Sequence, residues 1–199
     1  MIQNKSNIPY KTEDKTSPIN LYGLSKYKGE QFVQEIINNP KKAIILRTSW
    51  LMSNYGSNFA KKILKLHKEK ETFNVVSDHI GSPTSALNLA NICWQIIKKH
   101  NSFICDFDQN VPILHYSDSG IASWYDVAIA VGEIGVQTGL LQKMAEVNPV
   151  KSDTNISKVK RPSFSVLDSY KIKKLLNEKS NHWRKSMIEF FALIDREEI

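Results

Sequence analysis

Apolar residues recur along the chain in two patterns, one with helical spacing and one in short unbroken runs. The first helix is predicted over 20–38, after a polar segment that contains Pro9 and Pro18. Its inward stripe is predicted to be formed by Phe32, Val33, Ile36 and Ile37, and Asn38-Asn39-Pro40 ends it. Helical spacing predicts further helices over 58–70, 85–99, 123–136, 169–176 and 182–194.

Between these helices lie short apolar runs that predict buried strands, at 43–46, 73–77 and 113–116. Because strands alternate with helices, the sequence predicts an α/β fold with a parallel sheet. The run at 43–46 is followed by the polar sequence Arg47-Thr48-Ser49-Trp50. In open α/β sheets, ligands bind at the carboxyl ends of the strands, so this sequence is a candidate site.

Composition adds few constraints. The chain has 199 residues and a net charge of +7, which suits one domain, or one domain with a small lobe. Its lysines are scattered or lie at helix edges, which favours a solvated surface over a nucleic-acid site. A basic balance also suits an anionic small substrate such as a nucleotide sugar.

Cysteine and histidine usage argues against a disulfide framework or a metal site. The two cysteines, Cys93 and Cys105, are too few, and the five histidines show no paired ligand spacing. Cys93 lies in an apolar helical run and is predicted to be a core residue. There is no signal peptide pattern and no apolar run long enough to span a membrane. A cytoplasmic protein is therefore expected.

Tyr22 and Lys26 are four residues apart on the first predicted helix. This spacing puts both side chains on one face, with Cβ atoms roughly 5–6 Å apart. A nearby cation stabilises the phenolate and lowers the pKa of a tyrosine, which is ordinarily near about 10. The pair is therefore a candidate proton donor, although a solvated helix face gives the same spacing.

A dinucleotide-binding protein needs a glycine-rich turn after its first strand to seat the pyrophosphate. The chain has eight glycines but no G-x-G-x-x-G or close variant. Gly23 and Gly29 fall inside the first predicted helix instead.

An ordered series of short motifs extends from about Pro9 to Trp183 and resembles the dTDP-4-dehydrorhamnose reductases of the extended short-chain dehydrogenase/reductase superfamily. Each motif is modest, but their joint order and spacing are specific. They are Pro9-Tyr10, Tyr22-Gly23-Leu24-Ser25-Lys26, Gly29-Glu30, Arg47-Thr48-Ser49-Trp50, Gly56-Ser57-Asn58-Phe59, Val75-Val76-Ser77-Asp78, Gly81-Ser82-Pro83-Thr84, His115-Tyr116, Ser123-Trp124-Tyr125-Asp126 and Arg161-Pro162.

The resemblance implies a partial doubly wound, Rossmann-like parallel sheet with a small C-terminal substrate lobe. The nucleotide-binding part would cover 1–118, with an excursion into the substrate lobe at about 52–72, and the lobe would cover 119–199. The implied reaction is reduction of the 4-keto group of a dTDP-6-deoxyhexulose to dTDP-L-rhamnose with NADPH or NADH. The implied partner is the dTDP-sugar; the sequence patterns described above give no reason to expect nucleic acid, a membrane or a metal.

The resemblance also implies roles for individual residues. Tyr22 would donate the proton, and Lys26 would lower the pKa of Tyr22 and bind the nicotinamide ribose. Thr48 and Ser49 would line the nicotinamide end of the cleft, unless they only cap the strand. Trp50 would pack on the sugar, and Asn58 and Arg161 would bind the diphosphate; a core tryptophan, a helix cap and a surface arginine are the respective alternatives. Ser123 and Trp124 are assigned to helix capping and packing.

Two departures from the family are expected to matter. The family usually has Gln where His79 stands, and its catalytic Ser or Thr would fall upstream of Met1. We therefore expect the N-terminal half of the nucleotide-binding domain to be missing, leaving a chain inactive alone and with exposed apolar surface at 43–46 and 87–97. A separate N-terminal polypeptide or a homo-oligomer would compensate. A non-catalytic regulatory protein and a nucleotide-sugar epimerase or dehydratase stay open as alternatives.

Overall fold

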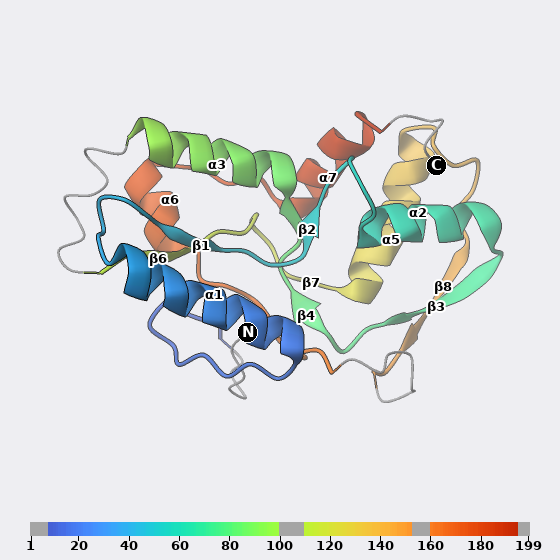
Figure 1. Ribbon diagram of the computed structural model, residues 1–199. Coiled ribbons are helices and arrows are strands. Elements are labelled where there is room, and N and C mark those ends of the chain that lie inside the picture. The colour runs from blue at the N-terminus through green and yellow to red at the C-terminus, as the bar shows by residue number, and fades with distance from the viewer. Residues whose placement is uncertain (1–7, 100–109, 153–159, 195–199) are drawn as a thin grey trace.

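The computed structural model describes residues 8–99, 110–152 and 160–194. Two groups of elements lie side by side (Figure 1), one around the strand pair β1–β6 and the other around the pair β3–β8. Cys105 and His100 lie outside the described residues. None of the described helices combines the length and the apolar character that crossing a membrane requires.

The first group consists of a parallel strand pair with helices on either side. β1 (Ile45–Arg47) pairs with β6 (Ile113–His115), and Leu46 lies opposite Leu114. α1 (Leu21–Ile37) lies on one side of this pair and α3 (Ala86–Lys98) on the other (Figure 1). This arrangement confirms the predicted α/β class with parallel strands.

The ends of α1 follow from its terminal residues. Asn20 is the N-cap, and its side-chain oxygen accepts a hydrogen bond from the backbone N–H of Gly23 at 2.7 Å. Asn38 adopts a left-handed conformation with φ of 37°, which ends the helix. The predicted helix over 20–38 is confirmed.

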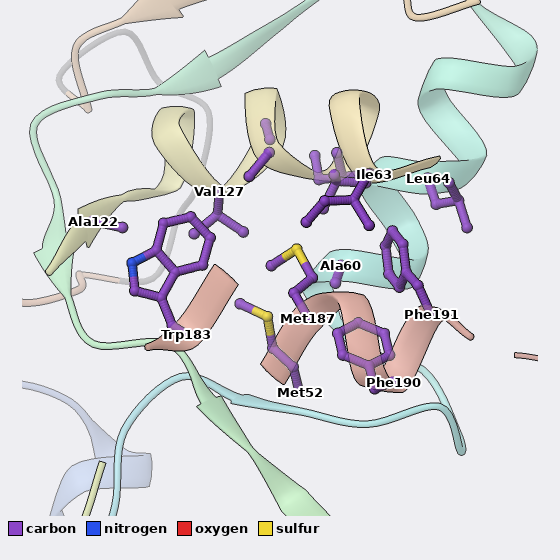
Figure 2. Close-up of a cluster of buried hydrophobic side chains, with 14 of the residues drawn as sticks. Met52, Ala60, Ile63, Leu64, Ala122, Val127, Trp183, Met187, Phe190 and Phe191 are labelled. Atoms are coloured by element: carbon purple, nitrogen blue, oxygen red, sulfur yellow. The ribbon is translucent and has the colours of Figure 1, made fainter. Parts of the chain in front are cut away.

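The second group contains the larger hydrophobic core (Figure 2). It is built by α2 (Phe59–Glu69), α5 (Trp124–Gln137) and α7 (Trp183–Phe191). Each fully buried large apolar side chain here contributes about 1.5–3 kcal/mol. The members of this core that are labelled in Figure 2 are Met52, Ala60, Ile63, Leu64, Ala122, Val127, Trp183, Met187, Phe190 and Phe191.

The strand pair of this group was only half predicted. β3 (Thr72–Val76) matches the predicted strand at 73–77, but its parallel partner β8 (Glu146–Val150) lies in a segment that the sequence pattern left irregular. β8 contains Pro149, opposite Val75. Proline is depleted in strands because it cannot donate a backbone hydrogen bond, so the pattern there did not indicate a strand.

Short strands connect the two groups. β2 (Leu51–Met52) pairs in parallel with β5 (Thr84–Ser85), and β4 (Ile80–Gly81) pairs antiparallel with β7 (Ala122–Ser123). Ser123 is also the N-cap of α5, and the Asp126 carboxylate accepts a hydrogen bond from the backbone N–H of Ser123 at 2.8 Å. The structural role predicted for Ser123 is confirmed.

A smaller core joins α3 and β6 to α6 (Tyr170–Leu176). It contains Ile92, Ile96, Leu114, Tyr116, Ile172 and Leu176. The remaining face of α3 is exposed, and Cys93 belongs to that face. The prediction that Cys93 is a core residue is therefore wrong. Apolar residues occur on two sides of this helix, but only one of those sides is buried.

The predicted inward stripe of α1 is also wrong in part. Phe32 is 56% exposed and Ile36 79% exposed. Their spacing is nevertheless that of a buried stripe. Gly23 is the one buried residue of α1, and the polar side chain of Glu30 connects the helix to Arg47 on β1.

Candidate functional site

Tyr22 and Lys26 lie in the first two turns of α1. The Nζ atom of Lys26 is 5.5 Å from the centroid of the Tyr22 ring. The ring is 64% exposed. The predicted placement of a cation beside the phenol on one helix face is thus present in the structure.

A cavity of about 460 Å³ lies between α1 and the carboxyl end of β1. Tyr22 and Lys26 form part of its wall on one side, and Thr48 and Ser49 form part of it on the other. Its remaining lining residues come from the segment before α1, from α1 and β1, and from the segment before α6; they are Tyr10, Thr16, Gly23, Tyr27, Glu30, Ile45, Leu46, Arg47, Phe164, Ser165 and Leu167.

Thr48 and Ser49 differ in what their hydroxyl groups do. Ser49 Oγ donates a hydrogen bond to the backbone carbonyl of Ser82 at 3.1 Å. Thr48 Oγ1 is buried and has no hydrogen-bond partner among the described residues. A buried hydroxyl without a partner costs free energy, so of the two residues Thr48 is the one whose hydroxyl has unused hydrogen-bonding capacity.

Beneath Tyr22 and Lys26, an ion pair connects α1 to β1. Arg47 Nε and Nη2 donate to the two carboxylate oxygens of Glu30 at 2.8 and 2.7 Å. Such bidentate pairing fixes both the distance and the orientation of the two groups. Sequence reasoning quoted both residues as motif members but assigned them no role, because a pair 17 residues apart leaves no local signal.

His115 on β6 completes this polar cluster. Its Nδ1–H donates to the Tyr10 carbonyl at 3.0 Å, which leaves Nε2 to accept from Arg47 Nη1 at 3.4 Å. Burial lowers the pKa of His115, and the charge of Arg47 lowers it further. A neutral imidazole is the form that can make both contacts.

Trp50 lies outside the lining of this cavity. Its indole stacks on Trp124, with ring centroids 3.5 Å apart and planes 7° from parallel, and Phe59 packs on Trp124 at 4.3 Å. Trp50 has a φ of 46°, an uncommon left-handed conformation for a residue other than glycine. One indole face is thus used by the stack, and its contact with a sugar stays a prediction.

Asn58 and Arg161 occupy different surroundings. Asn58 is the N-cap of α2: its Oδ1 accepts from the Lys61 N–H at 3.2 Å, and its Nδ2 donates to the Ser53 carbonyl. The capping alternative therefore describes what Asn58 does in this structure. Its contact with a diphosphate stays a prediction.

Arg161 is exposed and lies near the start of α1. The carbonyl of the preceding residue, Lys160, accepts a hydrogen bond from Asn20, the N-cap of α1, at 2.8 Å. Burial lowers the pKa of His79; nearby Asp78 opposes this effect, and the charge of Arg161 adds to it. The predicted contact of Arg161 with a diphosphate likewise stays a prediction.

Comparison with known proteins places these residues in a family. The family model for the RmlD substrate binding domain matches residues 3–195. The dTDP-4-dehydrorhamnose reductase of Aggregatibacter actinomycetemcomitans is 34% identical over 178 residues, which are 89% of this chain and 58% of that protein. The spore coat polysaccharide biosynthesis protein SpsK of Bacillus subtilis is 35% identical over 96% of this chain and 60% of its own length.

Solved structures agree with the sequence comparison. The dTDP-4-dehydrorhamnose reductase of Bacillus anthracis, solved in complex with NADP, superposes with a TM-score of 0.81 at 31% identity, over 96% of this chain and 62% of that chain. The UDP-glucuronic acid 4-epimerase of Bacillus cereus has a TM-score of 0.60 at 15% identity, which shows a shared fold alone.

These matches confirm the family resemblance and the Rossmann-like class predicted from the sequence. They also show that the chain spans about 60% of the length of the proteins it matches. With its Tyr22–Lys26 turn and the cavity beside it, the chain belongs to the RmlD substrate binding domain family.

Proposed function

We propose that this chain provides the proton donor and the sugar-binding part of an NADPH- or NADH-dependent reductase acting on the 4-keto group of a dTDP-6-deoxyhexulose. The observation that carries the proposal is that Tyr22, Lys26 and Thr48 line one cavity, with the Nζ atom of Lys26 5.5 Å from the centroid of the Tyr22 ring. Relatives named dTDP-4-dehydrorhamnose reductase support the choice of reaction.

In the proposed mechanism, Tyr22 donates its phenolic proton to the alkoxide that develops on C4 of the sugar. Lys26 stabilises the negative charge left on the phenolate, as positioned electrostatics do in many active sites. The Glu30–Arg47 pair holds α1, which carries both side chains, against β1. The nicotinamide cofactor, when bound, supplies the hydride.

The cavity residues fit the nicotinamide end of that cofactor. Thr48 lines the cavity and has a buried hydroxyl without a partner among the described residues, and Lys26 lines the same space. Both are hydrogen-bond donors suited to a carboxamide or ribose oxygen. The described residues contain no glycine-rich turn for the cofactor's phosphates.

The substrate would extend from this cavity toward the second group of elements. We propose Trp50 and Asn58 as contacts for the sugar and diphosphate, together with Arg161 at the N-terminal end of α1. Substrate contact at Trp50 would use the parts of the indole that Trp124 leaves free. The basic net charge of the chain supports an anionic substrate.

The proposed division of the chain is 1–118 for the nucleotide-binding part and 119–199 for the substrate lobe, with an excursion at about 52–72. The packing of α2 in one core with α5 and α7 supports it, as does the separate pairing of β1 with β6. We also propose that the protein works in the cytoplasm, where nucleotide sugars and reduced nicotinamide cofactors are made.

A chimera tests the function directly. Residues 8–194 of this chain would replace the matching part of the Bacillus anthracis reductase, and NADPH consumption would be followed with the dTDP-sugar. We expect turnover, and a loss of about 10²–10⁴-fold in kcat for Tyr22→Phe, the range typical of general acid catalysis. Tyr55→Phe is the matched control, because Tyr55 is also exposed but does not line the cavity. Full activity of Tyr22→Phe would refute the assignment.

A further inference from the structure

Three side chains from three elements form a continuous hydrogen-bonded series beside the cavity. Glu30 on α1 accepts two hydrogen bonds from Arg47 on β1, at 2.8 and 2.7 Å. Arg47 Nη1 also donates to Nε2 of His115 on β6, at 3.4 Å. His115 is 1% exposed and does not belong to the lining of the cavity, whereas Glu30 and Arg47 do. Any effect of His115 on the cavity is therefore transmitted by Arg47.

The two partners of His115 fix the form of its ring. The carbonyl of Tyr10 can only accept a hydrogen bond, so Nδ1 carries the proton that it donates at 3.0 Å. The guanidinium of Arg47 can only donate, so Nε2 must offer a lone pair. A protonated ring would instead turn a second N–H and a positive charge toward Arg47, whose Nη1 lies 3.4 Å away. The series is thus complete only when His115 is neutral.

The charges that act on His115 do not favour its protonated form. Burial lowers the pKa of His115 most, and the charge of Arg47 lowers it further. The Tyr10 carbonyl opposes this effect, as do the carboxylates of Asp168 and Glu30. The carboxylate of Glu30 is already paired with Arg47. A proton on His115 would therefore leave two cations to share the charge of Glu30.

The helices that share the smaller core with β6 supply no further counter-charge. Neither α3 nor α6 carries an acidic residue within its bounds. On α6, the half-buried Lys173 interacts with Asp118 and Asp168, which oppose the lowering of its pKa by burial. The one charged residue of α3 is Lys98, which is exposed. A protonated His115 would thus gain no new partner from these two helices.

Glu30 lies on the same face of α1 as the candidate proton donor. Tyr22, Lys26 and Glu30 follow one another at intervals of four residues, which places them along one side of the helix. All three line the cavity. Because bidentate pairing fixes both distance and orientation, the contact of Glu30 with Arg47 sets how this side of α1 rests on β1. A change in that contact therefore moves Tyr22 relative to Thr48 on the opposite wall.

We propose that His115 is a positioning residue that makes the placement of Tyr22 and Lys26 in the cavity depend on pH. The neutral ring holds Arg47 in the geometry that pairs with both oxygens of Glu30. When the ring gains a proton, Nε2 can no longer accept, the guanidinium leaves this geometry, and α1 shifts on β1. The inference rests on the proposed function only in taking Tyr22 as the proton donor.

The sign of the pH dependence follows from the direction of the pKa shift. The pKa of His115 in the folded chain lies below the ordinary value of 6.5, chiefly because the ring is buried. The positioned state is therefore present at neutral pH and is lost as the pH falls through the folded pKa.

The test follows Tyr22 and His115 in the full purified chain by nuclear magnetic resonance, with tyrosine and histidine rings that carry isotope labels. Tyr22→Phe and His115→Gln assign the two signals by their disappearance. We expect the Tyr22 signal to shift on acidification with the same midpoint as the His115 ring. His115→Gln should abolish that shift, because an amide can donate to the Tyr10 carbonyl and accept from Arg47 without titrating.

His67→Gln is the matched control. His67 is also buried, at 4% exposed, and its ring also makes one donor and one acceptor bond, to the backbones of Ala128 and Ala145. It does not belong to the lining of the cavity and has no printed contact with Arg47 or α1. This change should leave the Tyr22 titration as it is in the unaltered chain.

Arg47→Lys tests the transmitting residue. Lysine keeps the positive charge but lacks the planar fork that pairs with both oxygens of Glu30. We expect His115 to titrate still in this variant, whereas the Tyr22 signal should no longer follow it. This second variant keeps the proposal testable if His115→Gln does not fold.

Far-ultraviolet circular dichroism over the same pH range separates the local step from unfolding. The proposal is overturned if the Tyr22 signal does not titrate, if its titration persists in His115→Gln or Arg47→Lys, or if His67→Gln abolishes it equally. A Tyr22 shift that coincides with loss of helix would also overturn it. Since this measurement needs no turnover, an inactive chimera together with an intact Tyr22 titration would contradict the proposed function and leave the coupling standing.

Discussion

The guanidinium of Arg47 on β1 donates two hydrogen bonds, of 2.8 and 2.7 Å, to the carboxylate of Glu30 on α1. Both side chains are mostly buried, with 16% and 20% of their surface exposed. The pair therefore sets how the helix that carries Tyr22 and Lys26 rests on the strand that carries Thr48.

We expect Glu30→Ala to reduce the free energy of unfolding by about 2 kcal/mol, because it leaves a partly buried guanidinium without its carboxylate. Urea unfolding followed by circular dichroism measures this. Lys143→Ala is the control: Lys143 pairs with Glu71 on the surface, and such pairs contribute less than about 1 kcal/mol. Equal effects of the two changes would contradict the assigned role of Glu30.

Gly81 limits the position of the Trp50–Trp124 stack. A Cβ at Gly81 would clash with Cε2 of Trp50 and would lie 2.6 Å from its Nε1. We expect Gly81→Ala to destabilise the protein by about 1–3 kcal/mol, as overpacking does, and to change the near-ultraviolet circular dichroism of the stacked indoles.

Gly29→Ala is the matched comparison, because a Cβ there meets open space. We expect it to stabilise the free chain by about 0.5–1 kcal/mol, since alanine favours a helix interior. If both glycine replacements destabilised the chain alike, close contact with Trp50 would not be the reason for Gly81.

Stability should fall as the pH is lowered through the histidine range. His67 Nε2–H donates to the Ala128 carbonyl at 2.9 Å, and its Nδ1 accepts from the Ala145 N–H at 3.1 Å, so only the neutral ring makes both bonds. Burial lowers the pKa of His67 and of His115. The unfolded chain therefore takes up protons near pH 6.5, the ordinary pKa of histidine, while the folded chain resists them.

The stability that these two histidines contribute is thus present above about pH 6.5 and is lost as the pH falls toward their folded pKa. Urea midpoints across that range measure it. His67→Gln should reduce the pH dependence, because an amide can donate to Ala128 and accept from Ala145 without titrating. Greater stability in acid than at neutral pH would contradict the prediction.

Asp118 anchors the start of α3 to β6. Its carboxylate accepts from the Ser85 N–H and from Asn88 Nδ2, both at 3.0 Å, and from the Tyr116 hydroxyl at 3.2 Å. Burial raises the pKa of Tyr116, and the charge of Asp118 adds to it, so the hydroxyl stays protonated and donates.

Asp118 is 2% exposed. We expect Asp118→Asn to lower the free energy of unfolding by about 2–3 kcal/mol, because the substitution leaves a buried hydrogen-bond donor without an acceptor. Asp78→Asn is the control, because Asp78 is exposed and bonds Ser152 at the surface. Denaturant unfolding of both variants decides the matter. A loss at Asp118 no larger than that at Asp78 would show that burial of this carboxylate contributes nothing.

Local features of the chain were predictable because their causes lie close together in the sequence. The Asn20 cap, the left-handed Asn38 and the one-turn spacing of Tyr22 and Lys26 depend on residues within a few positions of one another. The same holds for Ser123 and Asp126. The apolar run at 43–46 indicated a parallel strand because a short run without polar residues suits few other elements. The expected burial on both faces was wrong, since the residues of β1 are only half-buried.

Tertiary structure alone decided the remainder. Periodicity showed that α1 and α3 have apolar faces, but not that Phe32 and Trp94 would be exposed, because a pattern does not say what covers it. The Glu30–Arg47–His115 cluster and the Trp50–Trp124 stack join residues far apart in the chain. The sequence by itself determined which chemical groups and which helix turns exist. Only long-range packing decided which of them share the cavity, because that depends on contacts that leave no local pattern.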